Sequence, residues 1–166
     1  MRSLKTILPL LLVFSTLSTF AQRKDVGGEL SVGPRLGGTL SASFKKHNNY
    51  NKSALELLLQ FKDFNNVDDN DLDGFGVSLL WEKLAPLSGN SQLSAMIGGG
   101  PAFNFNKDFN MGVSAVIGFD WRLKMAPITL QLDWMPTYYF VNISTFSATN
   151  AAFTARYVLN RRRYKK

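Results

Sequence analysis

The sequence predicts an all-β protein: an eight-stranded antiparallel up-and-down transmembrane β-barrel that follows a signal peptide. Three observations lead to this fold class. Apolar and polar residues alternate with a period of two in about eight segments, which is typical of strands with two different faces. The apolar faces of the regular segments carry no charge. After the leader, no apolar run is long enough to cross a membrane as a helix, so a chain that enters a membrane must do so as a closed barrel.

Residues 1–21 have the order of parts of a secretory signal peptide. Arg2 and Lys5 form a basic start, the apolar run 7–14 follows, and small and polar residues lead to Ala21. The apolar run is much shorter than the roughly 20 residues of a membrane-spanning helix, although an uncleaved anchor is the alternative. We therefore divide the chain into a signal peptide at 1–21, a barrel at 22–160 and a basic tail at 161–166.

Composition excludes several function classes. The 166 residues include no cysteine, which excludes disulfides, thiol nucleophiles and a lipoprotein anchor, and the single histidine is His47. Of the 19 lysines and arginines, two lie in the leader and five in the last six residues, so twelve remain in the body against twelve acids. A nucleic-acid-binding protein usually carries its basic charge on a folded face, so no nucleic-acid partner is expected.

Eight strands are expected along the body. They cover residues 29–36, 39–46, 54–62, 74–82, 92–105, 111–124, 128–134 and 151–159. Pro34 predicts a distortion in the first of these, and the glycine run 98–100 predicts close packing or a bend in the fifth. That run is not a phosphate loop, because neither Lys-Ser nor Lys-Thr follows it.

The orientation of the strand faces decides the compartment. In a barrel of about eight strands the interior is only wide enough for side chains. The polar faces combine small residues with a few large charged ones, which suits such an interior, while aromatic residues lie towards the ends of the apolar stripes, as in a membrane girdle. The expected girdle comprises Phe75, Trp81, Phe119, Trp121, Trp134, Tyr138 and Tyr139.

An ion-paired lumen without an open aqueous path follows from this orientation, because unpaired charges are costly in a narrow interior. The expected lumen charges are Glu29, Arg35, Glu56, Lys62, Glu82, Asp120, Arg122, Asp133 and Arg156. The alternative is a secreted, soluble, lipocalin-like barrel, which would turn Leu55, Phe61, Trp81, Phe119 and Trp134 inward around an apolar ligand.

The segment 110–136 joins two expected strands through a turn that contains Pro127, and it ends with Asp133, Trp134, Met135 and Pro136. This segment, together with GPRLGG at 33–38, resembles the small outer-membrane β-barrel domain family of Gram-negative bacteria. The resemblance covers roughly residues 27–160. It implies an eight-stranded barrel and no settled activity. Such barrels usually end at an aromatic residue, whereas here the basic tail RRRYKK follows the last strand.

Two further segments bear on chemistry. Asp69, Asp71 and Asp73 precede Gly74 in a D-x-D-x-D-G string, which matches the start of a calcium loop, but Leu80 stands where an EF-hand has glutamate. A weak Ca²⁺ contact and a solvated acidic turn are the two interpretations, and no other cofactor is expected. His47 is expected in a turn, without partners for a catalytic triad, so no enzyme activity is predicted.

The functional expectation is a non-enzymatic, porin-like barrel of the cell outer membrane with a structural or interaction role. A small transport or ligand-binding barrel is the second candidate, and the soluble barrel is the third. Outer-membrane lipid and the barrel-insertion machinery are the expected partners.

Overall fold

A computed structural model of the chain describes residues 28–48, 52–63, 74–87, 93–105, 109–123, 125–142 and 144–159, with the backbone alone at 62 and 63. These residues form ten β-strands and no helix. The strands are β1 (Leu30–Gly37), β2 (Thr39–His47), β3 (Ser53–Asp63), β4 (Phe75–Pro86), β5 (Leu93–Phe105), β6 (Phe109–Arg122), β7 (Ile128–Trp134), β8 (Thr137–Val141), β9 (Thr145–Ser147) and β10 (Ala151–Val158). Among the described residues no helix has the length and hydrophobicity that a membrane crossing requires.

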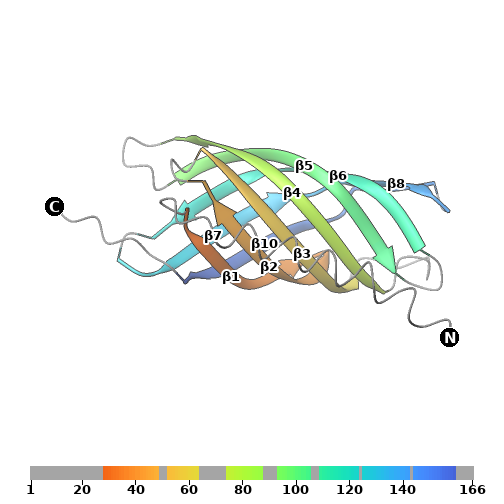
Figure 1. Ribbon diagram of the computed structural model, residues 1–166, viewed down its shortest axis with the longest axis horizontal. Coiled ribbons are helices and arrows are strands. Elements are labelled where there is room, and N and C mark those ends of the chain that lie inside the picture. Colours follow the sequence, from red (N-terminus) through yellow and green to blue (C-terminus); the bar gives the residue numbers. More distant parts are fainter. Residues whose placement is uncertain are drawn as a thin grey trace, which may run out of the picture.

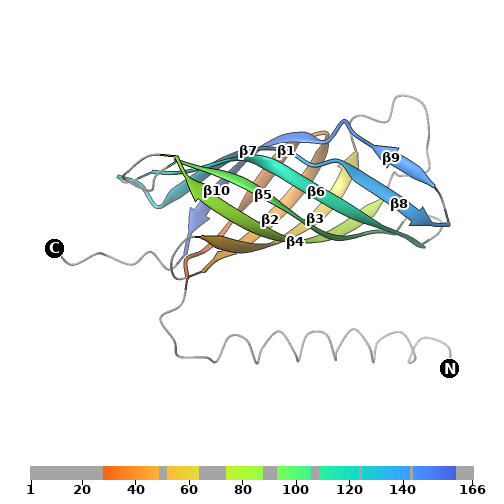
Figure 2. The ribbon, with the colours of Figure 1, turned by 90° about the horizontal axis from the view of Figure 1, so that it is seen from above.

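The strands form one closed antiparallel barrel. Their order is β5-β4-β3-β2-β1-β10-β7-β6-β8-β9, and β5 also pairs with β6, which closes the sheet. The first strand therefore lies beside the last, with Ser31 opposite Val158 and Gly37 opposite Ala152. Figures 1 and 2 show the strands running obliquely around the long axis, as closure of a barrel requires.

The ten strands occupy eight positions around the barrel, which we call staves. Two of the staves consist of two strands each, separated by a break. β6 pairs first with β8 and then with β7, so β7 and β8 together form one stave, and β9 and β10 form its partner. The interruption lies at Met135 and Pro136, where the amide of Met135 still donates to the carbonyl of Asn150 (2.9 Å) and the carbonyl of Pro136 accepts from the amide of Ala115 (3.0 Å). The predicted count of eight is confirmed, but β8 and β9 were not expected.

Burial alternates along each stave as the sequence pattern predicts. In β6, the outward residues Val113, Ile117 and Phe119 are exposed, while Ser114 and Asp120 are buried. One member of the expected aromatic girdle is an exception: Tyr139 on β8 is buried inside, whereas Tyr138 faces outward. That part of the prediction was wrong because inward and outward residues alternate without a change of parity from Ile128 to Phe140, so Tyr139 lies on the inward face with Asp133 and Thr137.

Gly98 and Pro34 mark two local irregularities of the wall, a close approach of two strands and an interruption in strand pairing. A Cβ added at Gly98 would lie 2.3 Å from the carbonyl oxygen of Trp81, so only glycine fits between β4 and β5 there. This is the close packing that the glycine run predicts. Pro34 has no N–H to donate. It lies between Val32 and Arg35, where the pairing of β1 with β10 is interrupted.

The barrel has two different ends. β1 begins and β10 ends at one of them, where the amide of Leu159 donates to the carbonyl of Leu30 (2.8 Å). We call this end the terminal rim; the β2–β3, β4–β5 and β6–β7 connections start and finish there. The opposite end, the hairpin rim, carries the β1–β2 and β8–β9 turns and the strand ends that flank residues 64–73 and 106–108.

Candidate functional site

The interior of the barrel holds a cluster of buried charges centred on Arg156. Its side chain projects inward from β10 and is only 1% exposed. Nε donates to the hydroxyl of Ser43 (2.6 Å), Nη1 donates to Oε1 of Gln131 (2.8 Å), and Nη2 forms an ion pair with Glu56. Ser43 and Glu56 come from β2 and β3, so one guanidinium joins β10 to these two strands across the lumen and also to its neighbour β7 through Gln131.

Lys45 on β2 is the second centre of the cluster. Its Nζ lies 2.6 Å from Oε2 of Glu82 and 3.1 Å from Oδ2 of Asp120, and it donates to Oε1 of Gln131 (2.7 Å). A more distant carboxylate, Glu56, lies at 3.9 Å. The ammonium group is completely buried. It therefore neutralises acids from β4 and β6, on the side of the lumen that Arg156 does not reach closely.

His47 lies next to this cluster rather than in a turn. It is the last residue of β2 and is buried, and its Nε2 is 3.7 Å from Oδ2 of Asp120. The expectation of a turn was wrong because the strand continues to the residue just before the asparagines, and the even spacing from Ser43 through Lys45 carries the imidazole to the inside.

A second ion pair lies farther from the terminal rim. Nη2 of Arg35 is 2.7 Å from Oδ1 of Asp133, and Nη1 donates to Oδ1 of Asn150 (3.1 Å). Gln131 donates from Nε2 to Oδ2 of Asp133 (2.9 Å) while its Oε1 accepts from Lys45 and Arg156. This single amide therefore connects the two groups of charges into one network.

A third pair lies at the terminal rim, where Nη2 of Arg122 is 2.9 Å from Oε2 of Glu29. These side chains are 22% and 14% exposed, unlike the fully enclosed pairs. Solvent weakens such a pair, so it stabilises the fold less than the pairs in the middle of the lumen.

The structure thus brings eight of the nine expected lumen charges together in pairs or clusters. These are Glu29, Arg35, Glu56, Glu82, Asp120, Arg122, Asp133 and Arg156. The side chain of Lys62, the ninth, lies outside the described residues, as do Asp69, Asp71 and Asp73 of the possible calcium loop.

Several participants were not predicted from the sequence, among them Lys45, His47 and Gln131 and the hydrogen-bonding partners Ser43 and Asn150. The signal for Lys45 was present, because a strand with Leu40, Ala42 and Phe44 outward must turn residue 45 inward. Gln131 shares a strand face with Asp133 and was passed over because it carries no charge. His47 lies beyond the expected end of its strand, at residue 46.

Part of the interior is apolar, where Leu58, Leu80, Met96, Val116 and Met135 form one buried cluster. The sulfur of Met96 lies 3.8 Å from Nζ of Lys45, so this cluster borders the charged one. The described part of the chain contains no group of three metal-ligating side chains suited to an ion. The buried ion pairs hold the staves together, because pulling two paired staves apart or removing one partner would leave an uncompensated buried charge.

The comparisons with known proteins identify no relative. No family model matches the chain, and neither a curated protein nor a solved structure matches it. The functional argument therefore depends on the geometry of the barrel.

Proposed function

We propose that the chain is a non-enzymatic β-barrel of a bacterial outer membrane, exported by a cleaved signal peptide, with a structural or interaction role. One observation carries the proposal: large apolar side chains cover the outside of the barrel while charged side chains are enclosed. The exposed strand residues include Leu55, Phe61, Leu79, Trp81, Ile97, Val113, Ile117, Phe119, Leu132, Phe153 and Tyr157. Soluble monomers rarely expose so extended an apolar surface, whereas hydrocarbon favours it.

The distribution of aromatic residues supports the same orientation. At the hairpin rim, Phe61, Phe75, Phe105 and Phe109 form a row of neighbouring rings across four staves, with centroid separations of 5.9, 6.3 and 5.4 Å. Towards the terminal rim, Trp81, Trp121 and Tyr157 are exposed. Two aromatic bands at opposite ends are the arrangement that the two water–membrane boundaries favour.

Membership of the small outer-membrane barrel family is part of this proposal. The Asp133–Pro136 segment that carries the resemblance coincides with the break between β7 and β8, so it has a structural role in the wall. Lipid and the barrel-insertion machinery are the proposed partners.

The competing functions receive less support from the geometry. A transport barrel needs a path, but Lys45, Glu56 and Arg156 fill the middle of the lumen and are buried. A soluble ligand-binding barrel needs its aromatic stripe inside, but Trp81, Phe119 and Trp134 face outward.

Membrane fractionation combined with a heat-modifiability gel tests the proposal. We expect the processed chain in the outer-membrane fraction, with a folded band that migrates differently from the boiled one. Planar-bilayer recordings of the refolded protein should show no stable conductance steps; regular steps would favour the transport function instead. A processed chain that stays monomeric without detergent would refute the membrane proposal altogether.

A further inference from the structure

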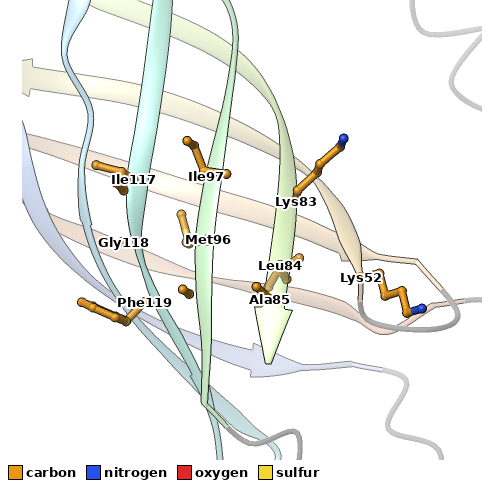
Figure 3. Close-up of a pocket in the computed structure, with 10 residues that line it drawn as sticks. Lys52, Lys83, Leu84, Ala85, Met96, Ile97, Ile117, Gly118 and Phe119 are labelled. Carbon is orange, nitrogen blue, oxygen red and sulfur yellow. The ribbon is translucent and has the colours of Figure 1, made fainter. Parts of the chain in front are cut away.

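The outer surface has a pronounced hollow that lies towards the terminal rim. Its volume is about 630 Å³, and it crosses β4, β5 and β6 (Figure 3). Ala85, Ile97, Ile117 and Phe119 line it and are exposed, while residues of the inward faces also reach it. The strands themselves therefore form the floor of the hollow.

The hollow exists because small side chains meet on neighbouring strands. Ala85 lies directly opposite Ala95, and Ala95 lies opposite Phe119. The next outward row consists of Lys83, Ile97 and Ile117, whose larger side chains form a wall. A floor of alanine methyl groups beside a wall of isoleucines gives an apolar groove.

The groove has charge at one side only. Lys52 and Lys83 line it, and Figure 3 shows both side chains beyond β4, away from Ile117 and Phe119. No acidic residue lines the groove. The neighbouring Glu82 points into the lumen and is engaged there by Lys45. The ammonium of Lys83 lies 5.6 Å from the centroid of the exposed Trp81 ring, within the range of a cation–π interaction.

We propose that this groove binds one anionic phospholipid, with an acyl chain along Ala85, Ala95 and Ile97 and the headgroup phosphate at Lys52 and Lys83. The inference rests on the proposed membrane location. Apolar concave sites with a few convergent polar groups are typical of ligand sites. Two lysines that line one apolar groove near the membrane boundary attract anionic headgroups over zwitterionic ones.

A second copy of this chain fits the groove less well. A two-fold interface would apply the same patch to itself and would bring both lysines of one copy towards those of the other. Four cations without an acid among the lining residues repel each other. A phosphate, by contrast, neutralises the two lysines.

The test is lipid retention by the full-length processed protein, measured by native mass spectrometry after refolding with equal amounts of dioleoylphosphatidylglycerol and dioleoylphosphatidylcholine. We expect the wild type to retain one phosphatidylglycerol with a preference of roughly tenfold. The double variant K52Q/K83Q should lose that preference. K46Q is the matched control, because Lys46 is an exposed lysine of β2 outside the groove, and it should behave as the wild type.

A second variant, Ala95→Phe, tests the groove independently of charge. It adds a ring on the outward face and should reduce retention of both lipids about tenfold. Equal retention of the two lipids by the wild type, unchanged preference in K52Q/K83Q, or a protein dimer in place of the lipid adduct would each overturn the inference. A heat-modifiability gel on every sample separates the two proposals: a folded, membrane-inserted protein without bound lipid refutes only the lipid site, whereas failure to insert refutes the membrane location.

Discussion

Arg156 on β10 forms a buried ion pair with Glu56 on β3, although 100 residues separate them in the sequence and two staves, β1 and β2, lie between their strands in the wall. The pair therefore crosses the lumen instead of following the sheet. The hydrogen bond from Arg156 to Ser43 on β2 also links strands that no ladder joins, whereas Gln131 lies on β7, which pairs directly with β10.

Replacing Arg156 with Met should destabilise the barrel by about 3–5 kcal/mol, because Glu56 would remain buried without its main partner. Urea unfolding of the refolded protein in detergent measures the change. The matched control is Arg122→Met at the terminal rim, where partial exposure should limit the loss to at most about 1 kcal/mol. Equal stability of both variants and the wild type would contradict the idea that the lumen charges hold the wall together.

Replacing Lys45 with Met should have an effect of similar size, about 3–5 kcal/mol, because Glu82 and Asp120 lose their ammonium partner. Adding Glu82→Gln to this variant removes one of the stranded charges and should restore part of the stability, with a coupling of about 0.5–3 kcal/mol in a double-mutant cycle. Lys46→Met, on the outward face of the same strand, should leave the unfolding midpoint nearly unchanged. A larger loss for Lys46→Met than for Lys45→Met would reverse the assignment of the two faces.

An outward charge should interfere with insertion according to its depth. Leu79 lies near the middle of β4 and Leu87 lies just beyond its end, and both are exposed. Leu79→Arg should cost about 2–4 kcal/mol of folding free energy in lipid vesicles, and Leu87→Arg only about 0–1 kcal/mol. The folded fraction on a heat-modifiability gel reports the difference. Identical folded fractions would argue that the apolar exterior does not face hydrocarbon.

Adding one methyl group at Gly98 should cost about 1–3 kcal/mol, because the new Cβ would meet the backbone of Trp81. Thermal unfolding of Gly98→Ala in detergent gives the loss. Ala115→Val on the adjacent strand adds volume to an exposed outward position and serves as the control. If both variants melt with the wild type, β4 and β5 are not as closely packed at this point as the structure indicates.

Much of the wall is predictable from the sequence, because the alternation of apolar and polar residues within each strand shows which residues face outward and which face inward. β6 and β10 alternate without interruption, so their inward and outward residues follow from parity alone. The β7–β8 stave is different. Its alternation continues through Met135 and Pro136, so the sequence pattern does not reveal the break, at which the partner of β6 changes from β8 to β7.

The sequence predicts which residues face the lumen better than it predicts which of them contact each other. Parity turns Glu56 and Arg156 inward, but their contact depends on the stagger of the strands and on which walls face each other after closure. Lys45 and Lys46 show a related difficulty. Two consecutive lysines suggest a solvated segment, yet in a strand they point to opposite faces, one enclosed among acids and one exposed.

The pairing of β1 with β10 also determines the timing of assembly. β1 cannot complete its pairing until β10 has been synthesised, so one of its hydrogen-bonding edges stays unpaired until then. An unpaired strand edge favours aggregation, so the chain is most exposed to misassembly before its last strand is made.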